Sequence, residues 1–241
     1  MFGNKKIKFH CLLPEVMEKY PIIKAKEHKP LWLKDSALAY KQDLQNNSKS
    51  NHVNGTVKCI GIQSILNRGF ILRTWHDLTI RTGIDPHKFE YIIPEAISSY
   101  LQARNYDSPL ISWFDGEDPR MRVPVPDGSL KTIIKLTMPW SVEIPKGWSL
   151  LIQPIPYPDE TAFTATHGVL GQGDFFEINP ILVWHKMQSE TLIKAGTPIC
   201  QLIPIKNEEI EFENLPYDDE TKKREMSWKY NICHRFVRNY T

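Results

Sequence analysis

The sequence predicts a mainly β protein of the α+β class, folded essentially as one domain. The chain has 241 residues, 41% of them hydrophobic, which is enough for a substantial core within the size range of single β-rich domains. It contains 18 prolines against 12 glycines, a balance typical of short extended segments separated by rigid turns. From residue 130 onward, strand-like runs follow one another with P-K-G and A-G-T-P turns between them.

The first half of the chain mixes short strands with helical turns. The polar stretch 45–55 (QNNSKSNHVNG) is rich in turn formers and is expected to be a surface loop. Around it, hydrophobic periodicity predicts strands over 7–13, 57–60, 70–80, 89–93 and 110–114, and helices over 14–20, 34–44, 62–66 and 95–104.

The second half is β-rich until a terminal helix. The expected strands cover 131–138, 141–144, 148–152, 177–185, 190–193 and 199–205. Residues 218–240 predict a helix, because apolar residues recur three or four positions apart at Met226, Tyr230, Cys233, Val237 and Tyr240. We therefore expect a β-rich domain over 1–217 and a basic amphipathic helix over 218–241.

Charge and cysteine content exclude several broad classes. A net charge of +2 and a pI near 8.2 give no global case for nucleic-acid or membrane binding. Cys11, Cys59, Cys200 and Cys233 lie far apart without a C-x-x-C pair, and the N-terminus does not resemble a signal peptide, so we expect a reducing compartment. Cys59 and Cys200 fall within apolar strand-like runs and are expected to be buried, unreactive thiols. No run approaches the roughly 20 apolar residues of a membrane span.

One candidate anion site lies in the expected strand 70–80. Alternation along a strand would place Arg73, Asp77 and Arg81 on one face, where Asp77 could orient two guanidinium groups toward an anion. The alternative is a ladder of surface charges with no ligand.

A metal site is the second candidate. His76, Asp77, His167 and His185 supply the ligand types of a site with two histidines and one carboxylate. His76 and Asp77 are adjacent, however, and neighbours on a strand point to opposite sides, so a hydrogen-bonded core histidine is the alternative. No nucleophile elbow, Walker loop, dinucleotide fingerprint or H-E-x-x-H motif is present. No catalytic residue is predicted, and no cofactor is expected.

The terminal helix is the third candidate. A basic helix of this kind can bind acidic partners, nucleic-acid backbone or a membrane surface. The alternative is that its apolar stripe packs on the domain and its charges face water. The candidate partner-binding residues are Lys222, Lys223, Arg224, Trp228, Lys229, Arg235 and Arg238.

Residues 144–206 resemble the core of the trimeric dUTPase family. They read IPKGWSLLIQP, HGVLGQGDFFEINPILVWH and LIKAGTPICQLIPIK, matching a Pro-Gly turn into a strand, a glycine-initiated hairpin and a closing G-[DT]-x-I-x-Q-L strand. The resemblance implies a β-clip (dUTPase-like) core at about 140–206, strand exchange between subunits and a homo-oligomer, with a trimer as one candidate. The residues that match the closing strand and the hairpin start are Ile199, Gln201, Leu202 and Gly168–Leu170.

The chemistry of that family does not carry over. Gly171 and Gly173 stand where the family has its aspartates, and the aromatic partner is displaced to Phe175. Residues 155–157 (IPY) replace the Arg-Ser-Gly phosphate-binding motif. The resemblance therefore implies a fold without the family's hydrolysis.

The layout of the chain also resembles a group of proteins encoded by tailed phages of marine bacteria. The segments that carry this resemblance are CIGIQSILNRGFILRTWHDLTI, the PW before the P-K-G turn, and IKAGTPICQLIPIK. It implies the cytoplasm of the host cell or the virion as location, and other phage or host proteins as partners. The leading hypothesis is a non-catalytic binding or structural protein, such as a virion or assembly component. The alternatives are a metal-dependent (Fe, Mn or Zn) enzyme of the cupin or oxygenase type and a nucleotide-binding regulator.

Overall fold

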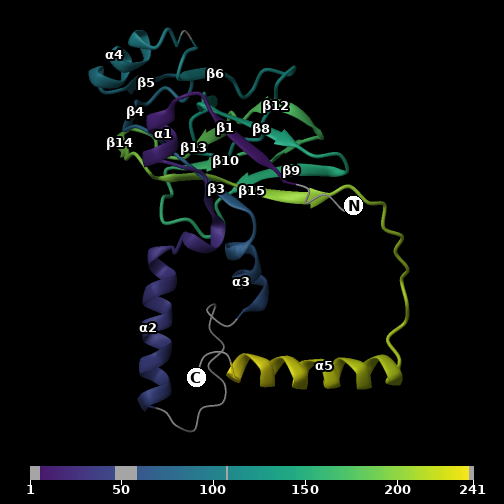
Figure 1. The fold of residues 1–241 in the computed structure, drawn as a ribbon. Coiled ribbons are helices and arrows are strands. Elements are labelled where there is room, and N and C mark those ends of the chain that lie inside the picture. Colours follow the sequence, from purple (N-terminus) through teal and green to yellow (C-terminus); the bar gives the residue numbers. More distant parts are fainter. Residues whose placement is uncertain (1–5, 47–58, 107, 239–241) are drawn as a thin grey trace. The chain divides into compact units, whose positions relative to one another are not determined.

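The computed structural model describes residues 6–46, 59–106 and 108–238 (Figure 1). The chain divides into two compact units, Met1–Asn207 and Glu208–Thr241. The division comes before the boundary at residue 217 that the sequence suggested, because residues 208–217 form no strand with the β-rich unit. The expected loop 45–55 lies almost wholly outside the described residues.

The mainly β, α+β class is confirmed. The helices of the β-rich unit are α1 (Pro14–Lys19), the 3-10 turn η1 (Ala25–Glu27), α2 (Leu31–Asn46), α3 (Ile60–Asn67) and α4 (Glu95–Ala103). Its strands are β1 (Lys8–Cys11), β2 (Ile23–Lys24), β3 (Phe70–Arg73), β4 (Leu78–Thr82), β5 (Phe89–Ile92), β6 (Ile111–Asp115), β7 (Thr132–Leu136), β8 (Trp140–Ile144), β9 (Trp148–Pro154), β10 (Phe163–Ala165), β11 (Gly168–Leu170), β12 (Gly173–Glu177), β13 (Ile181–Trp184), β14 (Ser189–Ile193) and β15 (Pro198–Lys206).

These strands form four antiparallel sheets. Their orders are β1-β8-β12, β10-β13-β7-β6, β11-β9-β15-β3-β2 and β14-β4-β5. The nine-residue strand β15 is the centre of the largest sheet, where it pairs with β9 on one side and β3 on the other. Burial on both sides explains its nearly continuous apolar sequence PICQLIPIK.

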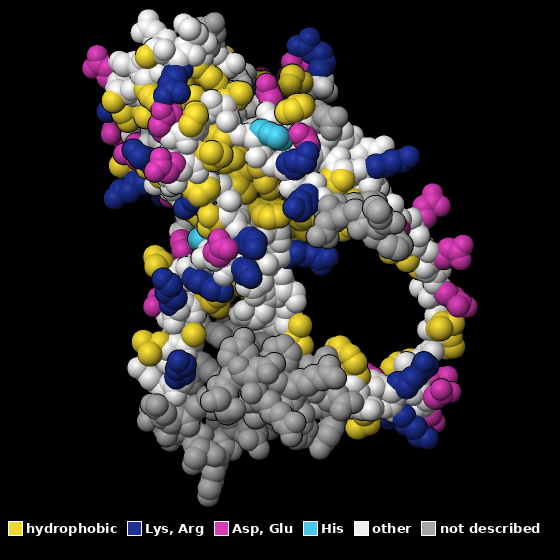
Figure 2. Space-filling view, in the orientation of Figure 1, with side chains coloured by type: hydrophobic (Ala, Val, Ile, Leu, Met, Phe, Trp, Pro, Cys, Tyr) yellow, Lys and Arg dark blue, Asp and Glu magenta, His cyan; other side chains and the backbone are white. Residues whose placement is uncertain are grey.

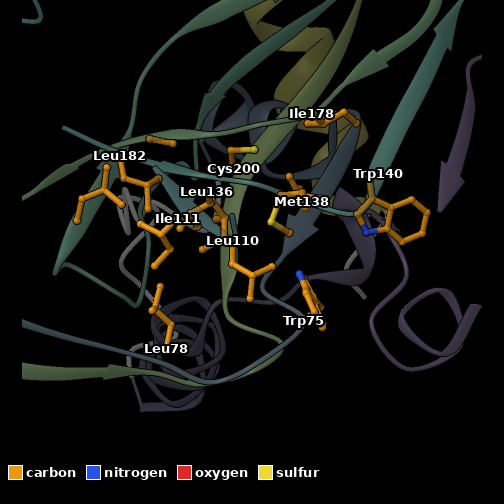
Figure 3. Packing of buried hydrophobic residues seen from close by; sticks show 14 of the residues in the cluster. Trp75, Leu78, Leu110, Ile111, Leu136, Met138, Trp140, Ile178, Leu182 and Cys200 are labelled. Carbon is orange, nitrogen blue, oxygen red and sulfur yellow. The ribbon is translucent and has the colours of Figure 1, made fainter. Parts of the chain in front are cut away.

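A single large core joins the sheets. Trp184, Leu72, Ile134, Leu150 and Leu202 are almost completely buried in it. Figure 3 shows part of this cluster, with residues from different sheets converging on one interior. Because the apolar faces of all four sheets contribute, the β-rich unit is held together by one common interior.

Two short helices are linked by a polar contact at the edge of this unit. Glu15 on α1 accepts a hydrogen bond from the Tyr100 hydroxyl on α4 at 2.5 Å. The same carboxylate also pairs with Arg104, just after α4. Both helices lie where the sequence predicted them, and α1 begins at Pro14, a residue well suited to a first helical turn.

The expectation of one strand over 70–80 is wrong. The chain forms β3 and β4 in different sheets, and residues 74–77 turn the corner between them. The segment that pairs with these two strands turns at the same place, because β14 pairs with β4 and β15, which follows it in the chain, pairs with β3. The Thr74 amide donates to Thr197 O at 2.9 Å and the Gly196 amide donates to Thr74 O at 2.8 Å, so a two-stranded ribbon continues around the corner.

Two further expectations need correction. Residues 59–60 do not lie in a strand, because Cys59 is the residue before α3 and its side chain is exposed. The apolar residues of that stretch follow a helical spacing that continues to Asn67. The expected strand 177–185 is divided into the end of β12 and β13, because residues 178–180 turn between two different sheets. The buried, inert environment expected for Cys200 is confirmed.

Candidate interaction surfaces

The second unit begins with an extended segment that exposes large apolar side chains. Ile210 and Phe212 are 84% and 85% exposed, and Leu215 and Tyr217 are exposed as well. Glutamates alternate with the first two of them, at positions 209, 211 and 213. Figure 2 shows acidic side chains along this extension. Residues 208–220 contain seven acidic residues and no lysine or arginine. This two-residue alternation is the pattern of a strand with one apolar and one acidic face.

The helix that follows is α5 (Asp219–Arg238), as the sequence predicted. Asp218 caps its start by accepting a hydrogen bond from the Thr221 amide at 2.7 Å, and Tyr217 donates to Glu225 at 2.5 Å. Of the predicted partner-binding residues, Lys222, Lys223, Arg224 and Trp228 are exposed on this helix. The side chains of the others, Lys229, Arg235 and Arg238, lie outside the described ones.

The predicted anion site is not assembled. Arg73 ends β3 and donates to Pro21 O at 3.0 Å, whereas Arg81 lies in β4 and pairs with Glu190 at 2.7 Å. Asp77 is in the corner between them and accepts a hydrogen bond from the Ala195 amide at 2.8 Å. The three side chains do not share one strand face because the strand that would align them is divided between two sheets.

The predicted metal ligands are not gathered either. The His76 ring bonds Asp77 O at 2.7 Å through Nδ1, and burial lowers its pKa. His185 contacts the hydroxyls of Ser129 and Thr164 at 3.2 and 2.7 Å. His167 lies in the turn between β10 and β11. Over the described ranges, no group of three histidine, cysteine, aspartate or glutamate side chains is placed to hold a metal ion.

A shallow pocket of about 250 Å³ lies beside the start of α2. His28, Asp159, Glu160 and Thr197 line it, and burial is the main cause that lowers the pKa of His28. Both carboxylates already bond to backbone amides. Asp159 accepts from the Leu31 amide at 2.9 and 3.1 Å, and Glu160 accepts from the Ala162 amide at 2.7 Å. The Asp159 contact anchors the start of α2, and the Glu160 contact holds its own loop, so both carboxylates have a structural role.

An exposed aromatic cluster was missed by the sequence reasoning. It consists of Phe89 and Tyr91 on β5 and Trp113 on β6, which are edge strands of two different sheets. The ring centroids of Phe89 and Trp113 are 5.7 Å apart, and Tyr91 lies 6.3 Å from each of them. Trp113 is 57% exposed and Tyr91 40% exposed. The available signal was the alternation of aromatic residues in F-E-Y, and the placement of Trp113 and Asp115 two positions apart in S-W-F-D.

Polar groups continue from this cluster on one side. Asp115 follows Trp113 on the same strand face, and His87 precedes Phe89. His87 Nδ1 is 3.9 Å from Asp115 Oδ1, and His87 Nε2 is 3.7 Å from Glu117 Oε2. Glu117 also pairs with Lys131.

The segment that contains β11 and β12, residues 168–177, includes an aromatic residue with a strained backbone. β12 has a bulge between Gly173 and Phe176, and Phe175 there has a φ of +58°. Its ring is exposed and lies 5.2 Å from the His10 ring. A bulge turns a side chain away from the regular alternation, which is how Phe175 comes to face outward.

Comparison of the chain with protein-family models and with curated proteins finds no match. Among the described residues, no helix combines the length and apolar character needed to cross a membrane.

Proposed function

We propose that this chain is a non-catalytic structural protein that assembles into a homo-oligomer through its C-terminal extension. The observation that carries the proposal is the segment 208–217, with four large apolar side chains exposed and glutamates alternating with two of them. An extended segment of this pattern can add to the edge of a sheet, where one face packs and the other remains in water.

Burial of this segment would supply a substantial driving force. Fully burying a large apolar side chain contributes roughly 1.5–3 kcal/mol. Ile210, Phe212 and Leu215 each offer most of their surface for this purpose. The gain must exceed the entropy lost when the segment becomes ordered, which favours an interface that buries all of them together.

The β-rich unit has sheet edges that could receive such a segment. β11 and β12 are edge strands, and Val169 on β11 and Phe175 on β12 are exposed apolar residues beside unpaired backbone edges. If the extension of one copy added to an edge strand of another copy, the exposed apolar side chains of both would be buried and the backbone of the edge strand would gain hydrogen bonds. A trimer is one closed arrangement that such an exchange can produce.

The proposed core is of the β-clip, dUTPase-like type at residues 140–206. Two features support it. β9 and β15 form a long antiparallel pair from Cys200↔Pro154 to Lys206↔Trp148, and β11 adds to β9 on its other side. β9, β11 and β15 carry the first motif, the start of the hairpin motif and the closing motif, and these three strands lie in one sheet, whereas β12 and β13, which carry the rest of the hairpin motif, lie in two other sheets.

Native mass spectrometry and sedimentation of the full chain test the assembly. We expect an oligomer for the native sequence and a monomer for the double variant Ile210→Ser with Phe212→Ser. Ile84→Ser is the matched control, because Ile84 is 84% exposed in a turn of the β-rich unit, like Ile210 in the extension. A monomeric native chain at micromolar concentration, or unchanged assembly of the double variant, would contradict the proposal.

We propose that this oligomer is part of the particle of a tailed phage, because the sequence resembles proteins encoded by such phages. Mass spectrometry of purified virions is expected to detect the chain at a fixed stoichiometry. If the chain is present in the infected cell but absent from virions, the proposed location in the virion is wrong, whereas the proposed homo-oligomer is not affected.

A further inference from the structure

We propose that the aromatic cluster of Phe89, Tyr91 and Trp113 is a binding site for a neutral oligosaccharide. The three rings lie on adjacent edges of two sheets, and Trp113 and Tyr91 expose much of their surface. A sugar ring has an apolar C–H face that packs on an aromatic ring and a border of hydroxyl groups that need hydrogen bonds.

The polar side of the cluster supplies those hydrogen bonds. Asp115 and Glu117 provide carboxylate acceptors, although one oxygen of Asp115 already accepts the Glu117 amide and one of Glu117 is paired with Lys131; the remaining ammonium hydrogens of Lys131 and the His87 ring provide donors. Sugar hydroxyl groups both donate and accept, so a mixed row of acceptors and donors next to apolar rings matches their chemistry. The aromatic and polar parts are contiguous because Trp113 and Asp115 share one face of β6.

The angles between the rings restrict the shape of the ligand. Trp113 is inclined by 58° to Tyr91 and by 89° to Phe89. Rings at these angles form a bent surface, whereas a flat crystalline polysaccharide would require coplanar rings. The geometry therefore favours a single, soluble saccharide chain.

The size of the cluster argues against a protein partner. An aromatic side chain buries about 150–250 Å² when fully covered. With Trp113 57% and Tyr91 40% exposed, the cluster falls well short of the roughly 800 Å² per partner of a stable protein interface.

The charges argue against a nucleic acid. Single-stranded nucleic acids also stack on aromatic rings, but their phosphates need a positively charged groove. Here Asp115 and Glu117 flank the rings, and Lys131 is paired with Glu117. A neutral ligand avoids this repulsion.

Isothermal titration of the full chain with glucose hexasaccharides of β-1,4, β-1,3 and α-1,4 linkage tests the site. We expect at least one to bind, Trp113→Ala to weaken binding by about tenfold or more, and Trp113→Phe to retain part of it. Trp228→Ala is the matched control, because Trp228 is 61% exposed on α5, and it is expected to bind like the native chain.

Three results would overturn the inference. They are the absence of binding by all three hexasaccharides at concentrations up to about 10 mM, where a dissociation constant in the millimolar range would still be detected, binding that survives Trp113→Ala, and an equal loss in Trp228→Ala. Thermal unfolding of each variant confirms that it is folded. Binding of a single-stranded oligonucleotide that disappears in Trp113→Ala, without saccharide binding, would replace the proposal with base stacking.

Discussion

The side chain of Gln201 accepts a hydrogen bond from that of Gln153 at 2.9 Å, across the two longest paired strands of the protein. Gln201 is completely buried, and its amide nitrogen donates to Ile65 O at 2.8 Å and to Arg68 O at 2.6 Å. Both of its amide hydrogens and its oxygen are therefore used. This one polar side chain joins the end of α3 to the centre of the largest sheet.

Gln201→Leu is expected to lower the free energy of unfolding by about 1–3 kcal/mol, because the Arg68 carbonyl loses the Gln201 amide and the Ile65 carbonyl keeps only the Arg68 amide, at 3.3 Å. Gln153→Leu removes one bond at a less buried position, so its cost is expected to be smaller, about 0.5–1.5 kcal/mol. Urea unfolding of both variants measures the difference. Equal stability of native protein and Gln201→Leu would show that the α3 contact contributes nothing.

Two glycines with nearly the same φ angle are expected to respond differently to alanine. Gly69 and Gly128 have φ values of +76° and +79°. A Cβ at Gly69 would lie 2.1 Å from Leu202 O, whereas a Cβ at Gly128 meets nothing within 4 Å. Gly128→Ala should cost only the conformational penalty of about 1–2 kcal/mol. Gly69→Ala should cost clearly more or prevent folding, as measured by thermal unfolding and yield, and similar losses in both would contradict the close approach of β3 and β15.

The stability of the protein is expected to fall with pH below about 6.5. Burial lowers the pKa of His76, and it is also the main cause that lowers the pKa of His28 and His185. The folded state therefore binds fewer protons than the unfolded state, and the stabilisation present above the unfolded pKa near 6.5 is lost as the pH decreases.

Unfolding in urea at pH 7.5 and 5.5 measures this loss, and an NMR titration should place the midpoint of His76 below 6.5. His76→Phe keeps a ring beside Trp75 and removes the titration, so its stability should depend less steeply on pH. A His76 midpoint above 6.5 would show that the ring is not desolvated as described.

The cysteines are expected to differ in their reaction with a thiol reagent. Cys59 is exposed at the start of α3, whereas Cys200 is completely buried in β15 and burial raises the pKa of its thiol. Cys59 should react in the native protein and Cys200 only after unfolding, as peptide mass spectrometry after labelling will show. As the control, the Cys59→Ser variant should lose the labelling that the native protein shows at position 59. Rapid labelling of Cys200 in the native protein would contradict the prediction and would mean that the sheet opens.

The sequence predicted the fold best where one local pattern determines one element. The continuous apolar run of β15, the alternation in β14 and the helical spacing in α5 each define one element, and all three lie within a few residues of their expected ranges. It predicted least where the chain turns between sheets. Residues 74–77 (TWHD) contain no glycine or proline, and the bend there depends on backbone bonds between Thr74 and Gly196, which are far apart in the chain.

The candidate sites show the same limit. The predicted alignment of Arg73 with Arg81 assumed a continuous strand, and it fails because the two residues belong to different sheets. The aromatic cluster was not predicted because Tyr91 and Trp113 meet only where the edges of two sheets come together. Local periodicity can identify the face of a strand, but it contains no information about which other edge lies beside it.

The continuity of β15 with the C-terminal extension has a mechanical consequence. β15 is bonded along its length to β9 and, over its first half, to β3, and the chain passes from Lys206 directly toward the extension. A pull on the extension therefore acts first on the C-terminal half of β15, which pairs with β9, and then on its N-terminal half, which pairs with both β9 and β3. When the load runs along the strand axis, the hydrogen bonds to β9 are sheared together and do not open one after another, so an assembly held by these extensions would transmit tension into the centre of each subunit.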